Sequence, residues 1–597
     1  MSRNDFAPLT KRKPEGPYEV YDIETTTDLK SVYLVGWYNG SEYRYWESLP
    51  VSPDSSDSAV SKFCGWYFGR RPVGVLYAHN GGNFDHLYVL RWLLQFEPHA
   101  RIEFVPVQSS ILLMTVYLGR YKYEFRDSMR LMVAGLDDIA QALLGRGKVE
   151  GIDYETLYRD PIRYEYLKRD CVALYDCIAK FRQVVVEKLN GAMGITAAAT
   201  AIATLRNGYL ARPIKRLSTS REAFVRRAYY GGRTEVFHSG GTFSLAQPLR
   251  CYDVNSMYVW ALAQPLPVDL IWETWGPVEW LGKTGFLECE VDTSGCSPAA
   301  RRIPVLPYRY AGKLLFPLGR LRGVWATPEL ALAIEQGYKI TWTGRGLWFR
   351  CSSVFAKYVE MLYRLRDKSL PTFDPTLSAI AKVLGNSTYG KFGTNREREK
   401  ILLNPPLEDV IEKGLRPLQG PLELPAYIED VQCDADYVLP HLSAWVTSLS
   451  RVKLWQYIAQ CWPARVYYCD TDSVCSTAEL TTGTGLGELK EESRDIIKAE
   501  FIAPKVYRLT HSDNSVTVRA KGFSQFGRKV ATDITSLAKG IPVQCSAMSK
   551  LRTVLRGDFG LIIRRKRMLR EGPKRQFLPD GSSIPWTIDH EKIVERA

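Results

Sequence analysis

Apolar runs with two different spacings alternate along the first 190 residues of the chain. Residues 31–38 (SVYLVGWY) and 72–80 (PVGVLYAHN) are rich in β-branched and aromatic side chains and predict strands, whereas residues 85–96 (DHLYVLRWLLQF) predict a helix. Strands that alternate with helices are typical of an α/β domain. Residues 190–212, which are rich in small side chains, predict a helical link to the second half of the chain.

Two carboxylates end the apolar run at residues 466–474 (VYYCDTDSV). If Asp470 and Asp472 lie on one strand they share a face, and two such carboxylates repel each other unless they are protonated or bridged by a cation. Asp253 ends a similar run (LRCYDV) and is the most plausible third member. Three aspartates on adjacent strand ends can hold two divalent ions, and hard oxygen ligands favour Mg²⁺ or Mn²⁺.

A mixed set of polar side chains lies between these acids in the sequence. Lys382, Asn386 and Tyr389, in residues 379–395 (AIAKVLGNSTYGKFGTN), are spaced to share one face of a helix. A lysine suits phosphates, an amide suits a sugar or template, and an aromatic ring suits a base. The pattern favours a bound nucleotide over a merely solvated face.

Composition narrows the class of partner. The net charge of +14 indicates a polyanion such as nucleic acid, with a merely basic surface as the alternative. The 12 cysteines form no CxxC pair, so we expect a reducing, cytoplasmic compartment without structural disulfides. No apolar stretch predicts a signal peptide or a membrane span.

The motifs DVNSMY, KVLGNSTYG and YCDTDS, in that order, resemble the three polymerase motifs of family B DNA polymerases. The resemblance implies that Asp253 and Asp472 ligate two metal ions together with the Val254 carbonyl, and that Asp470 supports the site as a further catalytic and metal-site carboxylate. It implies that Tyr258 lies under the sugar and excludes a 2′-hydroxyl. The implied nucleotide-binding residues are Tyr258, Lys382, Asn386 and Tyr389, with Arg366 and Lys368 as weaker candidates.

A second set of acids begins near the N-terminus. Asp22 and Glu24 alternate along a predicted strand, Asp85 stands at a loop-to-helix transition, and Tyr166 and Asp170 share a helix face. The order D-x-E, D, YxxxD resembles the 3′–5′ exonuclease domains fused to DNA polymerases. By that resemblance the four acids bind two metal ions and Tyr166 orients the attacking water.

Smaller motifs resemble those of the protein-primed subgroup. AYYGGRTEVF (228–237) matches its YxGG element, TSLSR (447–451) its template-contacting pair, PKVYRL (504–509) its primer-end pair and RDSMR (126–130) its single-strand ligand. In that subgroup Lys148 assists hydrolysis. The implied DNA-binding residues are Thr25, Asn80, Phe84, Ser128, Met129, Tyr154, Tyr229, Gly231, Gly232, Lys391, Thr447, Arg451, Lys505 and Tyr507.

The implied fold class is a multidomain α/β and α+β protein, in which a ribonuclease-H-like exonuclease precedes a right-hand polymerase with two terminal-protein-region insertions. The expected divisions are 1–190 exonuclease, 191–265 first part of the palm, 266–350 first insertion, 351–395 fingers, 396–439 second insertion, 440–525 second part of the palm and 526–597 thumb. Basic residues at 564–576 indicate either a phosphate grip or a solvated charge run.

These patterns predict a template-directed DNA polymerase with a proofreading exonuclease. Each site is expected to use two Mg²⁺ or Mn²⁺ ions. The resemblance implies protein-primed, strand-displacing replication of a linear phage or plasmid genome. The expected partners are primer-template DNA, single-stranded DNA, deoxynucleoside triphosphates and a terminal protein, and the chain is expected to be a monomer. The alternatives are a primer-independent family B polymerase and a DNA-binding nuclease with an inactive polymerase half.

Overall fold

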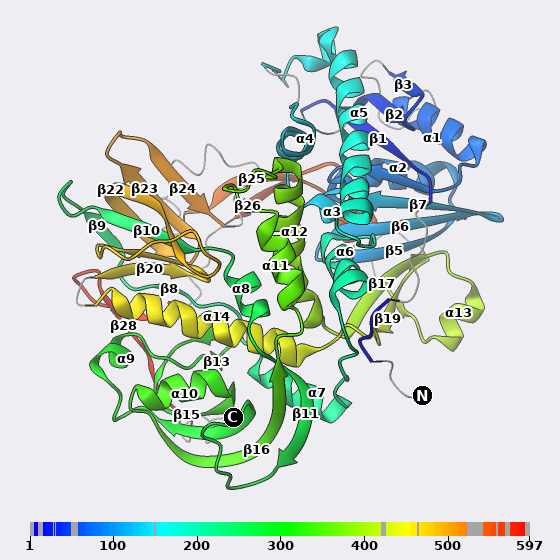
Figure 1. Cartoon of the computed structure of the whole chain (residues 1–597). Coiled ribbons are helices and arrows are strands. Elements are labelled where there is room, and N and C mark those ends of the chain that lie inside the picture. Colours follow the sequence, from blue (N-terminus) through cyan, green and yellow to red (C-terminus); the bar gives the residue numbers. More distant parts are fainter. Residues whose placement is uncertain are drawn as a thin grey trace.

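Two lobes joined by a set of central helices make up the molecule (Figure 1). The computed structural model describes residues 5–9, 16–27, 29, 31–48, 58–147, 151–153, 155–418, 425–462, 465–521, 541–556, 559–566 and 573–590. Within these residues no helix is both long enough and apolar enough to span a bilayer.

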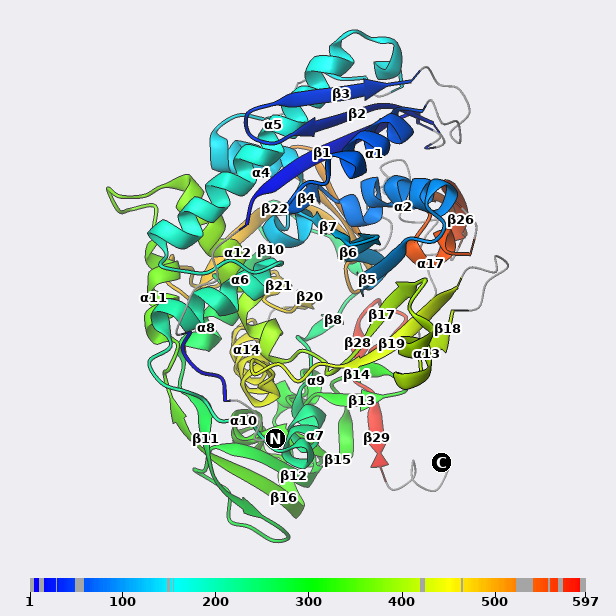
Figure 2. The same cartoon turned by 90° about the vertical axis from the view of Figure 1, so that its right-hand side faces the viewer.

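A ten-stranded mixed sheet forms the core of the first lobe. Its order is β18 (Arg416–Pro417), β19 (Ala426–Gln432), β17 (Glu397–Leu403), β5 (Arg101–Val107), β6 (Ser110–Leu118), β7 (Tyr121–Asp127), β4 (Val75–Ala78), β1 (Tyr18–Thr25), β2 (Val32–Tyr38) and β3 (Tyr43–Glu47). The strands predicted at 31–38 and 72–80 correspond to β2 and β4. Three strands from residues 397–432 continue the sheet begun by the N-terminal part of the chain (Figure 2).

Helices cover both faces of this sheet. They are α1 (Ala59–Arg70), α2 (Asp85–Phe96), α3 (Met129–Met132), α4 (Leu136–Leu144) and α5 (Ile162–Gln183), with 3-10 turns at Gly81–Asn83 and Leu157–Arg159. Consecutive residues on β2 separate the two faces. A Cβ on Gly36 would lie 2.8 Å from Leu167 Cγ of α5, whereas the ring of Trp37 packs 4.9 Å from that of Trp66 on α1. Since Asp22 is paired with Gly36 in the sheet, Asp22 faces α5.

The expected helical link at residues 190–212 is shorter than its composition predicts. The structure has a π-helical turn at Val184–Lys188, the helix α6 (Ala197–Thr204), a second π-helical turn at Leu205–Tyr209 and the helix α7 (Thr219–Ala228). The Thr196 hydroxyl caps α6 by accepting a hydrogen bond from the Ala199 amide (3.1 Å).

An eight-stranded, largely antiparallel sheet forms the second lobe. Its order is β24 (Val516–Ala520), β23 (Val506–His511), β22 (Leu489–Ala503), β10 (Leu249–Val254), β21 (Ser473–Ser476), β20 (Val466–Asp470) and β8 (Thr234–Val236), and β9 (Gly240–Thr242) pairs with β22. Strand β10 is therefore central and lies beside the β20–β21 hairpin, although more than 200 residues separate them in the sequence.

A five-stranded sheet lies beneath this lobe. It consists of β11 (Leu266–Thr274), β16 (Lys339–Ser352), β12 (Gly285–Asp292), β15 (Leu318–Ala326) and β29 (Thr587–Asp589), with α9 (Pro298–Arg302), α10 (Thr327–Glu335) and the hairpin β13 (Tyr308–Tyr310) and β14 (Lys313–Leu315). Residues 266–350 thus supply four strands of one sheet, which a strand near the C-terminus completes.

Four helices occupy the centre of the molecule: α8 (Met257–Ala263), α11 (Ala356–Arg364), α12 (Pro375–Phe392) and α14 (Pro440–Gln460). Asp374 caps α12 by accepting a hydrogen bond from the Thr376 amide, and Pro375 occupies its first turn. The remaining elements are α13 (Leu407–Glu412), α17 (Leu551–Val554), and the strand pairs β25 (Val543–Met548) with β26 (Leu561–Lys566) and β27 (Gln576–Phe577) with β28 (Ser583–Ile584).

Candidate active sites

The three carboxylates predicted to form a polymerase site meet where β10 and the β20–β21 hairpin end. Asp253 is paired with Ser473 of β21, and Ser473 is paired with Asp470 of β20. Asp472 does not continue β20, contrary to the predicted shared strand face. Thr471 (φ 63°) and Asp472 form the two-residue connection of the hairpin. The Val254 amide donates to the Asp472 carbonyl (2.8 Å), which ties the connection to the end of β10.

Lysines partly neutralise this cluster. Lys490 Nζ lies 3.2 Å from Asp253 Oδ2, and Lys505 Nζ lies 2.8 Å from both oxygens of Asp470. Burial and the nearby charges of Asp253 and Asp470 raise the pKa of Asp472 to about 7. Burial also raises the pKa of Asp253. The excess of buried negative charge at Asp472 is the environment that a divalent cation would relieve.

Asp470 is bonded on both oxygens within the protein. Besides Lys505, it accepts hydrogen bonds from the Tyr468 hydroxyl (3.2 Å) and the Thr471 hydroxyl (3.1 Å). These contacts favour a supporting role, in which Asp470 holds Lys505, over direct ligation of a metal ion. Asp253 and Asp472, with the Val254 carbonyl at the end of β10, remain the ligand set predicted for the polymerase site.

Side chains suited to a nucleotide gather on α8 and α12. The rings of Tyr258 and Tyr389 stack with centroids 4.0 Å apart, while Lys382 and Asn386 are exposed on the same helix as Tyr389. The positive charge of Lys382 acts on Asp253 and opposes the rise in its pKa. The helix predicted around these three α12 residues is therefore present, and it faces the acid cluster.

The two weaker phosphate candidates differ in their surroundings. Arg366 is half-buried and donates to the hydroxyl of Ser256, which lies in the turn between β10 and α8. Burial lowers the pKa of Arg366. Lys368 is exposed, one residue after Asp367. Arg366 thus lies at the edge of the acid cluster, within reach of an anionic ligand.

The second set of acids converges between β1 and α5. Asp22, Glu24 and Asp170 each offer an oxygen within 4.8 Å of the others, and in the described parts of the chain no other group of three acidic, histidine or cysteine residues does so. This spacing and oxygen chemistry fit a divalent ion. Tyr166, one helical turn before Asp170 on α5, is also buried.

Asp85 lies behind this group at the start of α2. Its Oδ1 accepts a hydrogen bond from the Ile23 amide (3.0 Å), on the strand between Asp22 and Glu24. Burial and the charge of Asp22 raise the pKa of Asp85 well above its usual range. Four carboxylates in so little solvent are stable together only if protons or cations offset their charge.

Asp127, at the end of β7, is a further buried acid that the motif search did not single out. Its Oδ1 accepts from the Met129 amide (3.0 Å), and burial raises its pKa to about 6. The Met129 amide and the nearby charge of Arg130 oppose that rise. Asp127 therefore holds the first residue of α3, and its position in RDSMR, directly before Ser128, was the signal available in the sequence.

The residues predicted to hold a single strand differ in exposure. Thr25, Asn80, Phe84 and Met129 are all partly exposed. Ser128 is fully buried, and its hydroxyl lies 3.2 Å from the Ala78 carbonyl and 3.0 Å from His79 Nδ1. The Ser128 hydroxyl is thus used within the protein in this structure, and the assignment of Ser128 as a DNA ligand stays a prediction. Lys148 and Tyr154 lie outside the described residues.

The YxGG element lies directly behind the β20–β21 hairpin. A Cβ on Gly232 would lie 2.8 Å from Thr471 Cγ2 and 3.1 Å from the Tyr258 hydroxyl, so only glycine allows this close approach. The ring of Tyr229 lies against Gly393, just beyond α12, whereas a Cβ on Gly231 would meet little. The element therefore connects the polymerase acids to α8 and α12.

Two residues predicted to touch template DNA are buried instead. Arg451 bonds both oxygens of Glu329 (2.7 and 3.0 Å) and donates to the carbonyls of Tyr230 and Gly231. Thr447 is also buried, and its hydroxyl donates to the Ala444 carbonyl (3.1 Å). In this structure α14 is covered on nearly every side and Arg451 holds the backbone of the YxGG element, and the template contacts expected of Thr447 and Arg451 stay a prediction.

Removing one partner of this buried ion pair should be costly. Replacement of Arg451 by methionine leaves Glu329 charged and buried, which is expected to lower the free energy of unfolding by about 3–5 kcal/mol. Chemical denaturation followed by tryptophan fluorescence would measure the loss. Replacing Glu329 by leucine in the same chain should restore much of it, and no restoration would contradict the pairing.

The remaining residues predicted to bind DNA are Lys391, Lys505 and Tyr507. Lys391, at the end of α12, is largely buried with Nζ 4.7 Å from the centre of the Tyr437 ring, and burial lowers its pKa. The Lys505 amide donates to the Tyr468 hydroxyl (2.8 Å), and the ring of Tyr507 packs 5.4 Å from that of Tyr468. Lys505 and Tyr507 thus lie beside Asp470, where a primer end would approach the acids.

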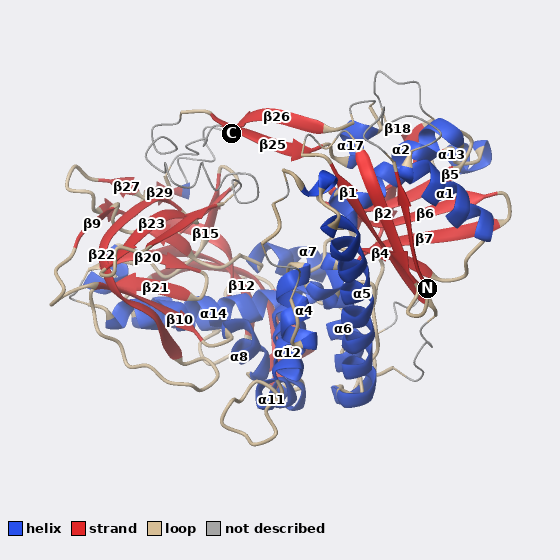
Figure 3. Cartoon of the chain, turned by 90° about the horizontal axis from the view of Figure 1, so that it is seen from above, coloured by secondary structure: helices blue, strands red, loops and turns tan. Residues whose placement is uncertain are grey.

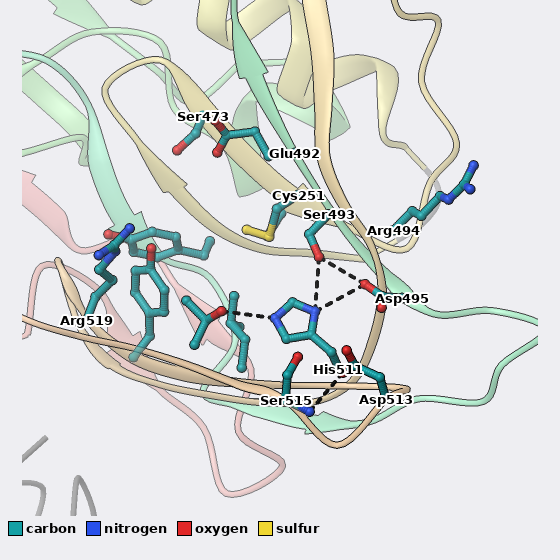
Figure 4. Close-up of a pocket in the computed structure, with 15 residues that line it drawn as sticks. Cys251, Ser473, Glu492, Ser493, Arg494, Asp495, His511, Asp513, Ser515 and Arg519 are labelled. Carbon is teal, nitrogen blue, oxygen red and sulfur yellow. Dashed lines mark hydrogen bonds and ion pairs between the residues drawn. A yellow bond between two sulfur atoms is a disulfide. The ribbon is translucent and has the colours of Figure 1, made fainter. Parts of the chain in front are cut away.

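A cavity of about 750 Å³ opens from Tyr507 along the face of β22, β23 and β24. Figure 4 labels His511 and Ser473, the residue after Asp472, among the side chains that line it. His511 lies 3.1 Å from Asp495 and 3.0 Å from the Thr517 hydroxyl. The cavity therefore extends from the residue beside Asp472 to the outer strands of the sheet.

A disulfide joins Cys251 and Cys475, which are directly paired on β10 and β21. This contradicts the expectation that the chain has no structural disulfide. The sequence spacing of 224 residues gave no hint of the pair, because only the fold brings the two strands together. The bond cross-links the two strands that present Asp253 and Asp472.

Basic residues near the C-terminus also differ from their prediction. Arg575 is buried, bonds Glu235 (3.4 Å) and donates to the Ser583 and Arg302 carbonyls. It is neither a phosphate grip nor a solvated charge. Residues 567–572 of the same basic run lie outside the described residues.

Comparison with known proteins agrees with this arrangement. Residues 160–414 match the family model described as DNA polymerase type B, organellar and viral. A DNA-directed DNA polymerase of Enterobacteria phage PRD1 is 26% identical over 546 residues, which cover 87% of this chain and 88% of the phage protein. A probable DNA polymerase of Neurospora intermedia is 27% identical over 58% of this chain, but the match spans only 37% of the fungal protein.

The fold has a close counterpart among solved structures. Phi29 DNA polymerase, in a complex with primer-template DNA and incoming nucleotides, matches with a TM-score of 0.68 over 93% of this chain and 99% of that protein, at 18% identity. This likeness establishes the fold: an exonuclease-type domain followed by palm, fingers and thumb. The chain is therefore similar to the organellar and viral type B DNA polymerases over residues 160–414 and to the phage PRD1 polymerase over most of its length, and it has the fold of phi29 DNA polymerase.

Proposed function

We propose that the chain extends a DNA primer on a template by two-metal phosphoryl transfer. The observation that carries this proposal is the junction of β10 with the β20–β21 hairpin, which places Asp253 and Asp472 together opposite the nucleotide-suited face of α12. Deoxynucleoside triphosphates and primer-template DNA are the substrates, as in the solved phi29 complex.

The chain's own residues have distinct roles in this reaction. Asp253, Asp472 and the Val254 carbonyl would hold Mg²⁺ or Mn²⁺, which activates the primer hydroxyl and stabilises the leaving pyrophosphate. Lys382, Arg366 and, more weakly, Lys368 bind the triphosphate. Asn386 and Tyr389 contact the nucleotide and the nascent base pair. Lys505, held by Asp470, and Tyr507 position the primer end, while Tyr229, Gly231 and Gly232 follow the template.

Tyr258 should decide between the two kinds of sugar. Its ring lies against Tyr389 and beside Gly232, so it cannot move away from a 2′-hydroxyl. Replacement by valine should raise incorporation of ribonucleotides, relative to deoxynucleotides, by about tenfold or more. Single-nucleotide extension with each triphosphate measures the ratio. Tyr389→Phe is the control, and an unchanged ratio in Tyr258→Val would remove the gating role.

We propose that the first domain is a 3′–5′ proofreading exonuclease. Asp22, Glu24, Asp170 and, behind them, Asp85 fit two Mg²⁺ or Mn²⁺ ions, and the 4.8 Å grouping of three of these acids supports the assignment. Tyr166 orients the attacking water, and Lys148 is proposed to assist. Thr25, Asn80, Phe84, Met129 and Tyr154 hold the frayed strand.

The resemblance to the protein-primed polymerases suggests how synthesis begins. We propose that residues 266–350 dock a terminal protein whose hydroxyl replaces the primer, and that residues 396–439 enclose DNA and favour strand displacement on a linear phage or plasmid genome. The five-stranded sheet supports the first assignment as a separate unit, and the extension of the exonuclease sheet by β17–β19 supports the second. The other divisions stay as proposed from the sequence: 1–190, 191–265, 351–395, 440–525 and 526–597.

One gel assay tests both activities. A 5′-labelled primer on a longer template is incubated with Mg²⁺, with and without deoxynucleotides. Extension with nucleotides and shortening without them would support both proposals. Shortening alone would favour the nuclease alternative, and extension from a bare template without any primer or terminal protein would favour primer-independent synthesis.

A further inference from the structure

A short segment near the C-terminus packs against the exonuclease domain. Met548, Leu551, Val554 and Leu555 belong to one apolar cluster with α1, α2 and β5. The ring of Phe559 lies 5.0 Å from that of Tyr88 on α2. Figure 3 shows β25 and β26, which flank this segment, reaching across between the two lobes. Residues 548–556 and Phe559 thus pack against α2 and its neighbours, although more than 450 residues separate them from α2 in the sequence.

Lys550 of this segment reaches the loop that precedes α2. Its Nζ donates to Asn83 Oδ1 (3.0 Å), and Asn83 Nδ2 in turn donates to Asn80 Oδ1 (2.9 Å). The Asn83 amide also donates to the Asn80 carbonyl (2.9 Å). The three side chains therefore form one hydrogen-bonded series that ends at Asn80.

Asn80 lies in a tight turn with a left-handed backbone (φ 61°), a conformation that asparagine adopts more readily than most residues. The loop is held on its inner side, where a Cβ on Gly82 would lie 1.9 Å from the Ile111 carbonyl oxygen. The outer side chains of Asn80 and Asn83 are held from the other direction by Lys550.

We propose that Lys550 is a positioning residue for the exonuclease site: through Asn83 it orients Asn80 toward the single strand. This inference rests on the proposed exonuclease function, in which Asn80 binds the frayed primer. A hydrogen bond from a charged donor contributes more than a neutral one, so its loss should release the Asn83 and Asn80 side chains. The metal-binding acids would keep their places.

The test compares full-length K550M and R552M with the wild type on a single-stranded oligonucleotide. Arg552 is two residues away, forms an exposed ion pair with Glu399 and carries the same charge, so R552M controls for loss of charge. K550M should raise the KM for digestion about tenfold with little change in kcat. R552M should match the wild type, as should extension of a paired primer by either variant.

A double-variant cycle separates positioning from general stability. Because Lys550 acts through Asn83, K550M combined with N83A should raise KM no more than N83A alone, and K550R should recover part of the affinity. Additive effects, an unchanged KM in K550M, or equal losses in K550M and R552M would each overturn the role of Lys550. A wild-type chain that digests no single strand would overturn the exonuclease proposal as well.

Discussion

Asp472→Asn should reduce primer extension on the order of 10³-fold or more, while digestion of a single strand continues. The neutral amide is a weaker metal ligand than a carboxylate and supplies no negative charge, and the lost stabilisation of transition-state charge is several kcal/mol. Steady-state extension on a paired primer measures the loss. Single-strand digestion by the same preparation is the internal control, and equal loss of both activities would contradict the separation of the two sites.

The same substitution should stabilise the metal-free chain. The folded protein raises the pKa of Asp472 to about 7, above the unfolded value near 3.9, so ionisation of this group opposes folding. The melting temperature of the asparagine variant should therefore exceed that of the wild type by a margin that grows from about pH 4 to pH 7 and then stays constant. Melting in EDTA across this range is the measurement. A variant that is inactive and less stable throughout would point to misfolding.

Replacing Asp22 and Asp170 by alanine should abolish digestion and leave extension intact. Asp22 and Asp170 each supply an oxygen to the group of three that lies within 4.8 Å. Their loss removes the ligand set, so the rate of digestion should fall on the order of 10³-fold or more. Release of labelled nucleotide from a single strand measures it. The variant should also accumulate mismatched ends during synthesis with a biased nucleotide pool.

A matched control removes a charge in the same domain but leaves the proposed metal-binding acids in place. Asp176→Asn on α5 removes a half-exposed carboxylate that pairs with Arg146, and it should leave digestion at the wild-type rate. If the control loses as much activity as the double variant, the effect comes from altered packing of α5 and the ligand assignment fails.

Local patterns in the sequence predicted much of the fold and the acids, because alternation and helical spacing determine which face a side chain occupies. Asp22 and Glu24 share a strand face, and Tyr166 with Asp170 shares a helix face, as predicted. The error at Asp472 arose because a two-residue turn, in which Thr471 has a left-handed conformation, has the same apolar flanks as a continuing strand.

Local sequence patterns could not predict contacts between residues that are far apart in the sequence. From the sequence alone, Arg451 would be expected at the surface as a basic residue. The fold brings Glu329, 122 residues earlier, beside it in a buried position. Lys490 beside Asp253, the Cys251–Cys475 disulfide and the role of Lys550 depend in the same way on contacts between distant segments. Side chains of this kind can be placed only once the sheets are assembled.

The pairing of β17 with β5 has a consequence for how this enzyme could be divided. Ile401 to Leu403 are paired with Ile102 to Phe104, so a single sheet draws on both halves of the chain. A fragment cut at residue 190 would leave β5 as an unpaired edge in one piece and β17 in the other, and open edges of this kind promote aggregation. The two halves to which the two activities are proposed to belong are therefore not interchangeable modules. To obtain synthesis without digestion, an engineer should therefore alter single side chains. A recombination event that exchanged one half of the chain would have had to bring matching edge strands with it.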